Sequence, residues 1–423
     1  MTIKAIRGFR DVLPEEARTW ARVEAIAARV LRTHGYQEIR LPVLEKTELF
    51  ARSIGESTDI VEKEMFTFPD RHGELLTLRP EATAGMVRAV LENNLVEGGR
   101  PLKLFFLGPM FRYERPQKGR QRQFHQLDVE AFNDPSPQMD AEIIVLLAHF
   151  LNEVGLDRLT VHVNSLGCAE CRPAFRRALE SFLRGVRGDL CPDCQRRLET
   201  NPVRVIDCKV PRCGELVQDA PWTVDFLCPD CRRHFDGLLQ ALRQAGVTPA
   251  LDRRLVRGLD YYTRTIFEVL HGELGSQNAV AGGGRYDDLA RSLGGPDIPA
   301  TGFALGLERL VMLLGRQGHP APEGPRLYVA ALDEAAVEKC FGLVQELRRR
   351  GFTVETDYMA GSLKSRLKRA DKLGALRVLI VGPDEIARGE AVLRDMATKE
   401  QVVLPWAGAI ENLAELLDKG DGS

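Results

Sequence analysis

Apolar residues recur along the chain at two spacings, which distinguish helices from strands. Residues 14–34 repeat apolar side chains every three or four positions, as a helix with one buried face does, and Gly35 follows as a stop signal. The apolar positions of this predicted helix are Trp20, Val23, Ala27, Val30 and Leu31. Residues 36–46 then have the pattern of a strand, which Pro42 restricts to a sheet edge or a bend.

Two further strands are predicted on either side of a basic connector. Residues 102–114 are almost entirely apolar until Arg112, and residues 123–132 alternate between apolar and polar side chains. We therefore expect an α+β fold, in which an antiparallel sheet is accompanied by helices, rather than an alternating βαβ array.

The character of the chain changes from Cys168 onward, where arginine, cysteine and proline become frequent and helices short. We expect a Cys-rich insertion at residues 168–240 within a domain formed by residues 1–325. The Pro/Gly-rich connector 315–325 ends this domain. Strands then alternate with helices in residues 326–423, which predicts a compact C-terminal α/β domain.

Composition limits the classes of protein to which this chain can belong. The chain has 423 residues, of which 44% are hydrophobic and 28% charged, so we expect a soluble protein of two or three domains. A net charge of −2 gives no global basic field, so a nucleic-acid partner must be met by a local patch. Signal-peptide and membrane-span patterns are absent from the sequence, which predicts a cytoplasmic protein with no membrane partner. In that compartment, the nine cysteines favour metal binding or packing over disulfides.

The alternation of apolar and polar side chains in residues 123–132 indicates a ligand site. One face carries Leu127, Val129 and Ala131, and the other carries Phe124, Gln126, Asp128 and Glu130. A solvated sheet face would show the same alternation, but the apolar partner strand indicates a hairpin buried on much of both sides. Arg112 and Glu130 then need partners, because an unpaired buried charge costs several kcal/mol. A bound ligand is the partner that we expect.

The connector between these strands is basic and carries Arg115, Lys118, Arg120 and Arg122. Charged loops of this kind usually lie in solvent without a ligand. A flexible basic loop between two ligand-facing strands also suits phosphate oxygens or a nucleic-acid backbone, and we favour this second interpretation.

Three later segments also indicate a ligand. The glycine run in "AGGGRYDDL" is compatible with a tight turn, but it also allows a ligand to approach the backbone closely. "TGFALGLERL" leads into a helix that we expect to begin near Glu308 and Arg309, and this arginine is suited to an anion or a purine ring. "RGLDYYTRTIFEV" has the pattern of a strand. Its first residues, from Arg257, include polar groups whose burial in a sheet would cost free energy.

These segments resemble the signatures of one enzyme family. Motifs 1, 2 and 3 of the class II aminoacyl-tRNA synthetases resemble, in order, "GYQEIRLPVLEK", "FRYERPQKGRQRQFHQLDVEAF" and "GFALGLERL". The signatures that distinguish histidyl-tRNA synthetases within subclass IIa are similar to "LTLRPEATAG", "LVRGLDYYTRTIFEV" and "AGGGRYDDL". The C-terminal region, with "RGEAVLRDM", resembles the class IIa anticodon-binding fold. The chain thus resembles the bacterial-type histidyl-tRNA synthetases over nearly its whole length.

The resemblance implies an activity, cofactors and partners. The implied reaction joins L-histidine to tRNA(His) in two steps through histidyl-adenylate, and it uses ATP with Mg²⁺. The motif 1 resemblance implies a homodimer, and residues 326–423 would bind the anticodon. An alternative is a catalytically silent synthetase paralogue that serves as a regulatory subunit of ATP phosphoribosyltransferase. Such relatives typically lose the C-terminal domain and the ATP-binding arginines, whereas this chain has Arg112, Arg257 and Arg309.

Site residues are carried over from the same motifs. The implied histidine-binding residues are Glu81, Thr83, Gln126, Glu130, Tyr261 and Tyr262. The implied ATP-binding residues are Arg112, Phe124, Arg257 and Arg309, of which Arg112 and Arg257 are catalytic. The implied contacts to the tRNA acceptor end are Lys118, Arg120 and Arg122. The chain departs from the family at Ala82, where a glycine is usual.

The implied roles agree with the chemistry of amino-acid activation. A carboxylate attacks the α-phosphorus in line, and fixed guanidinium groups stabilise the charge that develops on the phosphate oxygens. Glu130 would accept a hydrogen bond from the imidazole of histidine. Recognition of this kind rejects apolar isosteres, because they leave buried polar groups unpaired.

Eight of the nine cysteines lie in the expected insertion, at Cys168, Cys171, Cys191, Cys194, Cys208, Cys213, Cys228 and Cys231. Three pairs have the C-x2-C spacing of zinc knuckles, which favours Zn²⁺ binding, although the family resemblance does not imply it. Two four-cysteine sites would use all eight thiols. A single site from Cys191, Cys194, Cys228 and Cys231 would use the two "CPDC" pairs. Buried thiols without metal, or disulfides after oxidation, are the alternatives. The ninth cysteine, Cys340, is expected on the buried face of a helix.

Overall fold

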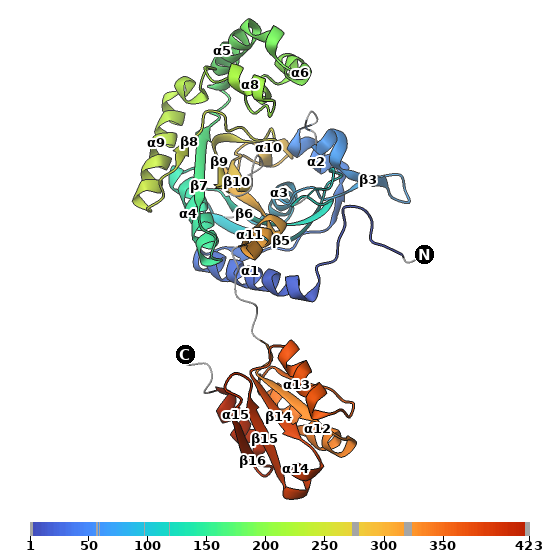
Figure 1. Ribbon diagram of the computed structural model, residues 1–423. Helices are drawn as coiled ribbons and strands as arrows, with labels where there is room; N and C mark the ends of the chain where they lie inside the picture. The colour runs from blue at the N-terminus through green and yellow to red at the C-terminus, as the bar shows by residue number, and fades with distance from the viewer. Residues whose placement is uncertain are drawn as a thin grey trace. The chain divides into compact units, whose positions relative to one another are not determined.

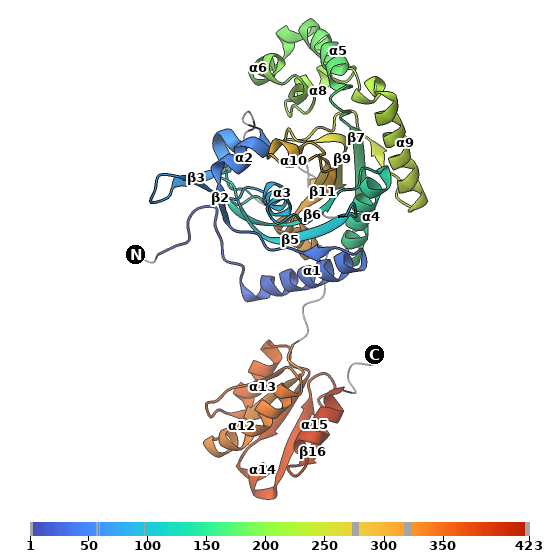
Figure 2. The same cartoon turned by 180° about the vertical axis from the view of Figure 1, so that it is seen from behind.

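The computed structural model describes residues 3–55, 58, 60–96, 98–117, 119–272, 279–316 and 324–418. The chain divides into two compact units, Met1–His319 and Pro320–Ser423. Each unit has its own hydrophobic core, and the first also contains the Cys-rich segment (Figures 1 and 2). Among the described residues, every helix is too short or too polar to cross a membrane.

An eight-stranded sheet forms the centre of the first unit, in the order β1-β5-β6-β11-β10-β9-β7-β8 (Figure 1). Its neighbouring strands are antiparallel except in the two outer pairs, β1 with β5 and β7 with β8. The strands are β1 (Gln37–Glu38), β5 (Leu102–Phe111), β6 (Gln123–Phe132), β7 (Leu159–Ser165), β8 (Ala250–Leu251), β9 (Thr263–His271), β10 (Ala279–Arg285) and β11 (Ala300–Gly306). The predicted antiparallel α+β architecture is confirmed.

The strand predicted around Pro42 divides into two short pieces. β1 lies at the edge of the large sheet, and Pro42 itself lies outside both strands, in the break between them, where no ladder hydrogen bond is needed. Beyond Pro42, β2 enters a separate three-stranded sheet in the order β2-β4-β3. The strands of this sheet are β2 (Leu44–Lys46), β3 (Phe66–Pro69) and β4 (Leu75–Leu78). A π-helix, Ile60–Glu64, precedes β3.

Four helices pack against one face of the large sheet and complete the main core. They are α1 (Pro14–Thr33), α4 (Pro137–Glu153), α9 (Pro229–Gln244) and α11 (Leu307–Arg316). The apolar stripe predicted for the first helix is confirmed, since its five positions are the buried residues of α1. Leu127, Val129 and Ala131 of β6 point into this core. The start of α4 is fixed by Ser136, whose side chain accepts a hydrogen bond from the amide of Met139.

The opposite face of the sheet carries a second cluster, centred on Met86, Phe106 and Tyr286. Three helices belong to this side, namely α2 (Thr47–Ile54), α3 (Thr83–Glu92) and α10 (Leu289–Ser292). Between these helices and the sheet, polar residues of β6 remain uncovered by apolar neighbours, and they form the site described below.

The Cys-rich segment forms a helical group at one end of the unit, where α5, α6 and α8 lie together in both views (Figures 1 and 2). Its elements are α5 (Arg172–Gly185), η2 (Arg187–Asp189), α6 (Pro192–Thr200), α7 (Val203–Ile206), α8 (Pro211–Leu216) and η3 (Thr223–Phe226). This group has a small core of its own that includes Phe175, Leu179 and Leu183. In contrast, Phe235, Leu238 and Leu242 of α9 are buried in the main core.

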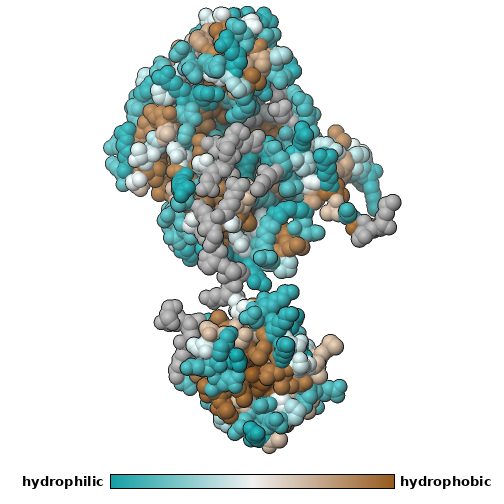
Figure 3. Space-filling model, viewed as in Figure 1, coloured by the Kyte–Doolittle hydropathy of each residue, from teal (hydrophilic) through white to brown (hydrophobic). Residues whose placement is uncertain are grey.

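The C-terminal unit is the α/β domain that the sequence predicts. Its five-stranded sheet has the order β13-β12-β14-β15-β16, with parallel pairing of β12 to β13 and β14 and antiparallel pairing beyond. The strands are β12 (Leu327–Ala331), β13 (Val354–Thr356), β14 (Arg377–Val381), β15 (Glu390–Asp395) and β16 (Gln401–Pro405). The helices are α12 (Glu334–Arg349), α13 (Leu363–Lys372), α14 (Pro383–Arg388) and α15 (Ala409–Asp418). Cys340 is buried on α12, as predicted, and Figure 3 shows an apolar area on the side of this unit that faces the viewer.

Candidate active site

A cavity of about 670 Å³ opens beside β6, β9, β10 and β11. The structure brings eleven of the predicted substrate and tRNA residues to its wall. They are Glu81, Thr83, Arg112, Arg120, Phe124, Gln126, Glu130, Arg257, Tyr261, Tyr262 and Arg309. These residues come from segments far apart in the sequence, so the fold assembles one site from them.

Glu130 is buried in the wall of this cavity, where two hydrogen bonds hold it. Thr83 Oγ1 donates a hydrogen bond of 2.7 Å to one carboxylate oxygen, and the hydroxyl of Tyr286 donates one of 2.5 Å to the other. The carboxylate is buried, and burial raises its pKa from 4.5 to about 8, although both hydrogen bonds act in the opposite direction. Tyr286 belongs to "AGGGRYDDL", but sequence reasoning gave it no role.

Gly302 makes room for the Glu130 carboxylate. The two residues are directly opposite each other in the pairing of β6 with β11. A Cβ atom at position 302 would lie 1.5 Å from Oε2 of Glu130 and 2.4 Å from the carbonyl oxygen of Val129. A glycine is therefore required here by close approach, a constraint that only the three-dimensional pairing reveals.

Glu81 lies at the N-terminus of α3 and faces the same cavity. It accepts a hydrogen bond of 2.8 Å from the amide of Ala84 and one of 3.3 Å from the hydroxyl of Tyr261. Burial raises its pKa. Ala82, the departure from the family pattern, is buried with a φ of −97°, so its backbone conformation is an ordinary one for alanine.

Between Glu81 and Glu130, the cavity wall holds unpaired oxygen atoms. Both carboxylate oxygens of Asp128 and Oε1 of Gln126 are buried without a hydrogen-bond partner among the residues that the structure describes. Burial, reinforced by the nearby Glu130 and Glu81, raises the pKa of Asp128 well above its ordinary value. Buried acceptors of this kind are normally satisfied, so this wall suits a cation that donates several hydrogen bonds. The sequence placed Asp128 on the ligand-facing side of β6, but no role was predicted for it.

Aromatic rings form the neighbouring wall. The rings of Tyr261 and Tyr262 lie 4.7 Å apart, and those of Tyr261 and Tyr286 lie 5.6 Å apart. Phenol rings contribute an apolar surface with a polar tip, which is suited to a small planar side chain.

Arg257 is held against the glycine run. Its Nη1 lies 2.6 Å from Oε1 of Glu268 on β9, and its guanidinium carbon lies 5.6 Å from the centre of the Tyr262 ring. A Cβ atom at position 282 would lie 2.3 Å from Nη1 of Arg257, so Gly282 provides the space for this side chain. The glycine run lies within β10, so the tight-turn interpretation is wrong, and at Gly282 the space is taken by the side chain of Arg257.

Two more guanidinium groups line the cavity. Arg112 donates from Nε to the carbonyl of Pro80 at 2.8 Å, and its guanidinium carbon lies 5.3 Å from the centre of the Phe124 ring. Arg309 donates from Nη1 to the carbonyl of Ala279 at 2.6 Å, and burial lowers its pKa. Both groups retain further N–H donors for an anionic ligand.

Only part of the basic connector lines the cavity. Arg120 lines it and pairs with Glu114 at 2.8 Å. Arg122 does not line it, because its guanidinium group stacks over the ring of Tyr113 at 3.6 Å. Lys118 lies outside the described residues.

The Cys-rich segment also reaches the cavity rim, which sequence reasoning did not predict. Side chains from α6 to α7 that line the cavity are Arg196, Arg197, Thr200, Asn201 and Arg204. Arg204 Nη1 donates a hydrogen bond of 3.0 Å to the backbone carbonyl of Arg257. The insertion thus contacts the segment that carries the predicted catalytic arginine.

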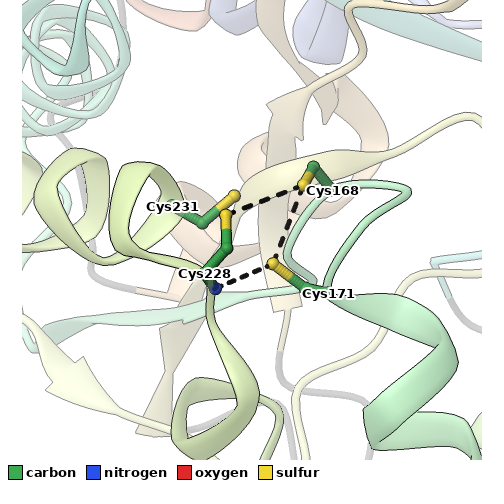
Figure 4. A group of neighbouring side chains, drawn as sticks. All are labelled: Cys168, Cys171, Cys228 and Cys231. Carbon is green, nitrogen blue, oxygen red and sulfur yellow. Dashed lines mark hydrogen bonds between the residues drawn. The ribbon is translucent and has the colours of Figure 1, made fainter.

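The eight cysteines of this segment form two separate groups. The first contains Cys168, Cys171, Cys228 and Cys231, and the second contains Cys191, Cys194, Cys208 and Cys213. Figure 4 shows the first group, in which the four side chains point toward one another. The alternative of a single site from the two "CPDC" pairs is wrong, because each pair belongs to a different group, whereas the alternative of two four-cysteine groups agrees with the structure.

Comparison with known proteins gives the family. A histidyl-tRNA synthetase family model matches residues 8–171 and 230–310, and an anticodon-binding domain model matches residues 326–416. The histidine–tRNA ligase of Desulfosudis oleivorans is 53% identical over 98% of this chain and 99% of its own length. That of Geobacter sulfurreducens is 50% identical over 95% of this chain and 97% of its own length.

Solved structures agree with this assignment. The crystal structure of the S. aureus histidyl-tRNA synthetase superposes with a TM-score of 0.82 at 33% identity, over 97% of this chain and 99% of that one. A Bacillus halodurans protein described as an ATP phosphoribosyltransferase regulatory subunit/histidyl-tRNA synthetase has a TM-score of 0.66 at 22% identity, over 90% of this chain and 99% of its own, and it shares the fold. The family models and the close relatives together span both units, and the chain belongs to the histidyl-tRNA synthetase family.

Proposed function

We propose that this chain joins L-histidine to tRNA(His), first forming histidyl-adenylate from ATP and then transferring the histidyl group to the tRNA. One observation carries the proposal: Glu130, positioned by Thr83 and Tyr286, lies in the same cavity as the guanidinium groups of Arg112, Arg257 and Arg309. An imidazole acceptor and a set of phosphate-binding cations are the two chemistries that histidine activation requires.

The part of the cavity around Glu130 would hold the amino acid. Glu130 would accept a hydrogen bond from the imidazole, with Tyr261 and Tyr262 against the ring. The α-ammonium group would lie near Glu81, Thr83 and Gln126. Asp128 adds a further carboxylate to this wall, and its unpaired oxygens support the placement of a cationic group there.

The part of the cavity that is lined by Arg112 and Arg309 would hold ATP. Arg112 and Arg309 would bind phosphate oxygens, with Phe124 beneath the adenine. Arg257 would contact both the histidine carboxylate and the α-phosphate and stabilise the charge that develops during in-line attack. The carboxylates of Glu114 and Glu268 also line the cavity, and oxygen donors of this type suit Mg²⁺, which when bound would neutralise phosphate charge.

Each unit would bind a different part of the tRNA. Arg120 at the cavity rim would contact the acceptor end, together with Lys118 and Arg122 of the same connector. Residues 326–423 would bind the anticodon, and residues 1–325 would form the catalytic domain with its insertion at 168–240. The exposed lysines Lys364, Lys368 and Lys372 on α13 support an RNA-binding role for the C-terminal domain, since phosphate contacts dominate RNA affinity.

The active form would be a cytoplasmic homodimer. Support comes from apolar side chains that are exposed on the motif 1 segment and on the small sheet that follows it, namely Val43, Leu44, Phe68 and Leu75. Exposed apolar groups gathered in one region are typical of protein–protein interfaces.

Histidine-dependent exchange of pyrophosphate into ATP tests the activation step. We expect exchange with histidine and none with histidinol, which lacks the carboxylate that Arg257 would bind. Absence of exchange with histidine would instead favour the regulatory paralogue.

A further inference from the structure

We propose that the Cys-rich segment holds two structural zinc ions. One ion would be bound by the neck group, Cys168, Cys171, Cys228 and Cys231, and the other by the tip group, Cys191, Cys194, Cys208 and Cys213. We further infer that these ions position the insertion against the amino-acid end of the cavity. The second inference rests on the proposed function, whereas the first does not.

The geometry of both groups is that of a tetrahedral thiolate site. The four sulfur atoms of each group lie within 4.8 Å of one another. Individual Sγ–Sγ distances are 3.7 Å for Cys168–Cys171, 4.0 Å for Cys168–Cys228 and 3.9 Å for Cys191–Cys208. Four sulfurs at about 2.3 Å from one tetrahedral zinc ion lie about 3.8 Å apart. A disulfide bond requires about 2.05 Å instead, and all nine cysteines are free.

The backbone around the thiols is arranged to stabilise thiolates. The amide of Cys228 donates a hydrogen bond of 3.1 Å to Sγ of Cys171, and the amide of Cys191 donates one of 3.2 Å to Sγ of Cys213. Each "CPDC" pair also spans a helix start, with the first cysteine at the N-cap and the second in the first turn. N–H donors and helix N-termini favour the ionised sulfur that zinc requires.

Packing without a metal ion explains the arrangement of these cysteines less well. A buried cysteine that only fills space, such as Cys340, lies among aliphatic residues of one core. Here, in contrast, the thiols face one another in two sets of four. The tip group also lies in a small core whose other fully buried members are Phe175 and seven aliphatic residues. A core of this size generally needs a covalent or metal crosslink to fold stably.

The neck group joins the insertion to the strand beside the tyrosines. It directly follows Gly167, whose carbonyl oxygen accepts hydrogen bonds from the amide of Arg264 at 2.9 Å and from Oγ1 of Thr263 at 3.1 Å. Arg172, next to Cys171, donates to the backbone carbonyl of Tyr262. A metal ion that holds Cys168 and Cys171 to the start of α9 would therefore fix the backbone from which Tyr261 and Tyr262 project.

The tip group supports the segment that carries Arg257. It ties the starts of α6 and α8 to Cys208, which follows α7. Arg204 of α7 donates its hydrogen bond to the backbone carbonyl of Arg257. Both ions would thus act at a distance, as positioning elements that do not contact substrate.

Elemental analysis of the full-length protein, purified under reducing conditions without chelator, tests the metal assignment. We expect two zinc ions per chain, one after Cys171→Ser or Cys213→Ser, and none after both. Cys340→Ser, the matched control for loss of a buried thiol, should retain two. A single ion per chain, iron in place of zinc, or metal-free protein with all eight thiols reactive would overturn the assignment.

Cobalt replacement provides a measurement that does not depend on variant folding. Wild-type protein reloaded with Co²⁺ should show the absorption bands of tetrahedral cobalt with four thiolates, at an intensity that corresponds to two ions. Octahedral cobalt spectra would contradict the proposed ligands.

A separate measurement tests the inference that the zinc ions position the insertion. Removal of zinc by a chelator should raise the histidine KM in pyrophosphate exchange and expose residues 172–229 to protease, and added zinc should reverse both. Unchanged KM and unchanged protease resistance in zinc-free protein would overturn it. If no amino acid supports exchange even in zinc-loaded protein, the proposed function fails while the zinc count and the protease result still stand.

Discussion

Replacement of Glu130 by glutamine should affect histidine recognition and protein stability in opposite directions. Glutamine has the same shape, so Thr83 and Tyr286 keep a partner, but glutamine cannot lose a proton to become the charged acceptor that a bound imidazole would use. A hydrogen bond to a charged group contributes about 1.5 to 3 kcal/mol. We therefore expect kcat/KM for histidine in pyrophosphate exchange to fall by about 10- to 150-fold.

The stability change follows from the raised pKa. Burial raises the pKa of Glu130 from 4.5 to about 8, so the folded state keeps a proton that the unfolded state releases in this window. The folded state binds more protons, and stability therefore falls as the pH rises from 4.5 to about 8. At 1.36 kcal/mol per pKa unit, this loss reaches at most about 5 kcal/mol above pH 8 and about 2 kcal/mol at pH 6. Glu130→Gln removes the loss, so its stability gain over wild type should be larger at pH 9 than at pH 6.

Thermal unfolding of the ligand-free proteins at pH 6 and pH 9, together with exchange assays, measures both effects. Glu48→Gln, which alters an exposed glutamate on α2, is the matched control and should change neither quantity. The reasoning is refuted if Glu130→Gln keeps the wild-type kcat/KM for histidine. It is also refuted if the stability difference between variant and wild type is the same at both pH values.

Three further changes test other parts of the site. Arg257→Ala should reduce histidine activation by about 100-fold, because one preorganised transition-state donor contributes about 3 kcal/mol; near-normal exchange in folded protein would exclude the role. Gly302→Ala should raise the histidine KM, since its Cβ would meet the Glu130 carboxylate, whereas Gly315→Ala, with open space around its Cβ, should not; equal KM values for the two variants would contradict the packing argument. A chain that ends before Arg326 should still activate histidine but charge tRNA poorly; equal charging by truncated and full-length dimers would show that the C-terminal unit only stabilises the dimer.

The sequence predicted the architecture where local patterns decide structure. The helical stripe from Trp20 to Leu31 became the buried face of α1, and the alternation along β6 separated core residues from cavity residues. Helix and strand periodicities depend on neighbouring residues, so they can be read without knowledge of the fold. Pro42 likewise marked the break between β1 and β2, because its missing N–H is a local property.

What the sequence did not reveal depends on contacts between distant segments. Tyr286 reaches Glu130 only because β10 and β11 bring the two together, and the need for glycine at position 302 arises from the cross-strand pairing with that carboxylate. The cysteine spacing was equally compatible with several groupings. The fold separates the two "CPDC" pairs, because α9 returns to the neck of the insertion, whereas α6 lies in its helical group.

The central claim is that this chain attaches histidine to tRNA(His), and charging of unfractionated bacterial tRNA tests it most directly. Each of the twenty standard amino acids would be supplied in turn with ATP and Mg²⁺, and the charged tRNA would be identified by sequencing. The account predicts that histidine alone is attached, and only to tRNA(His). Attachment of another amino acid, or no charged tRNA with any of them, would contradict it.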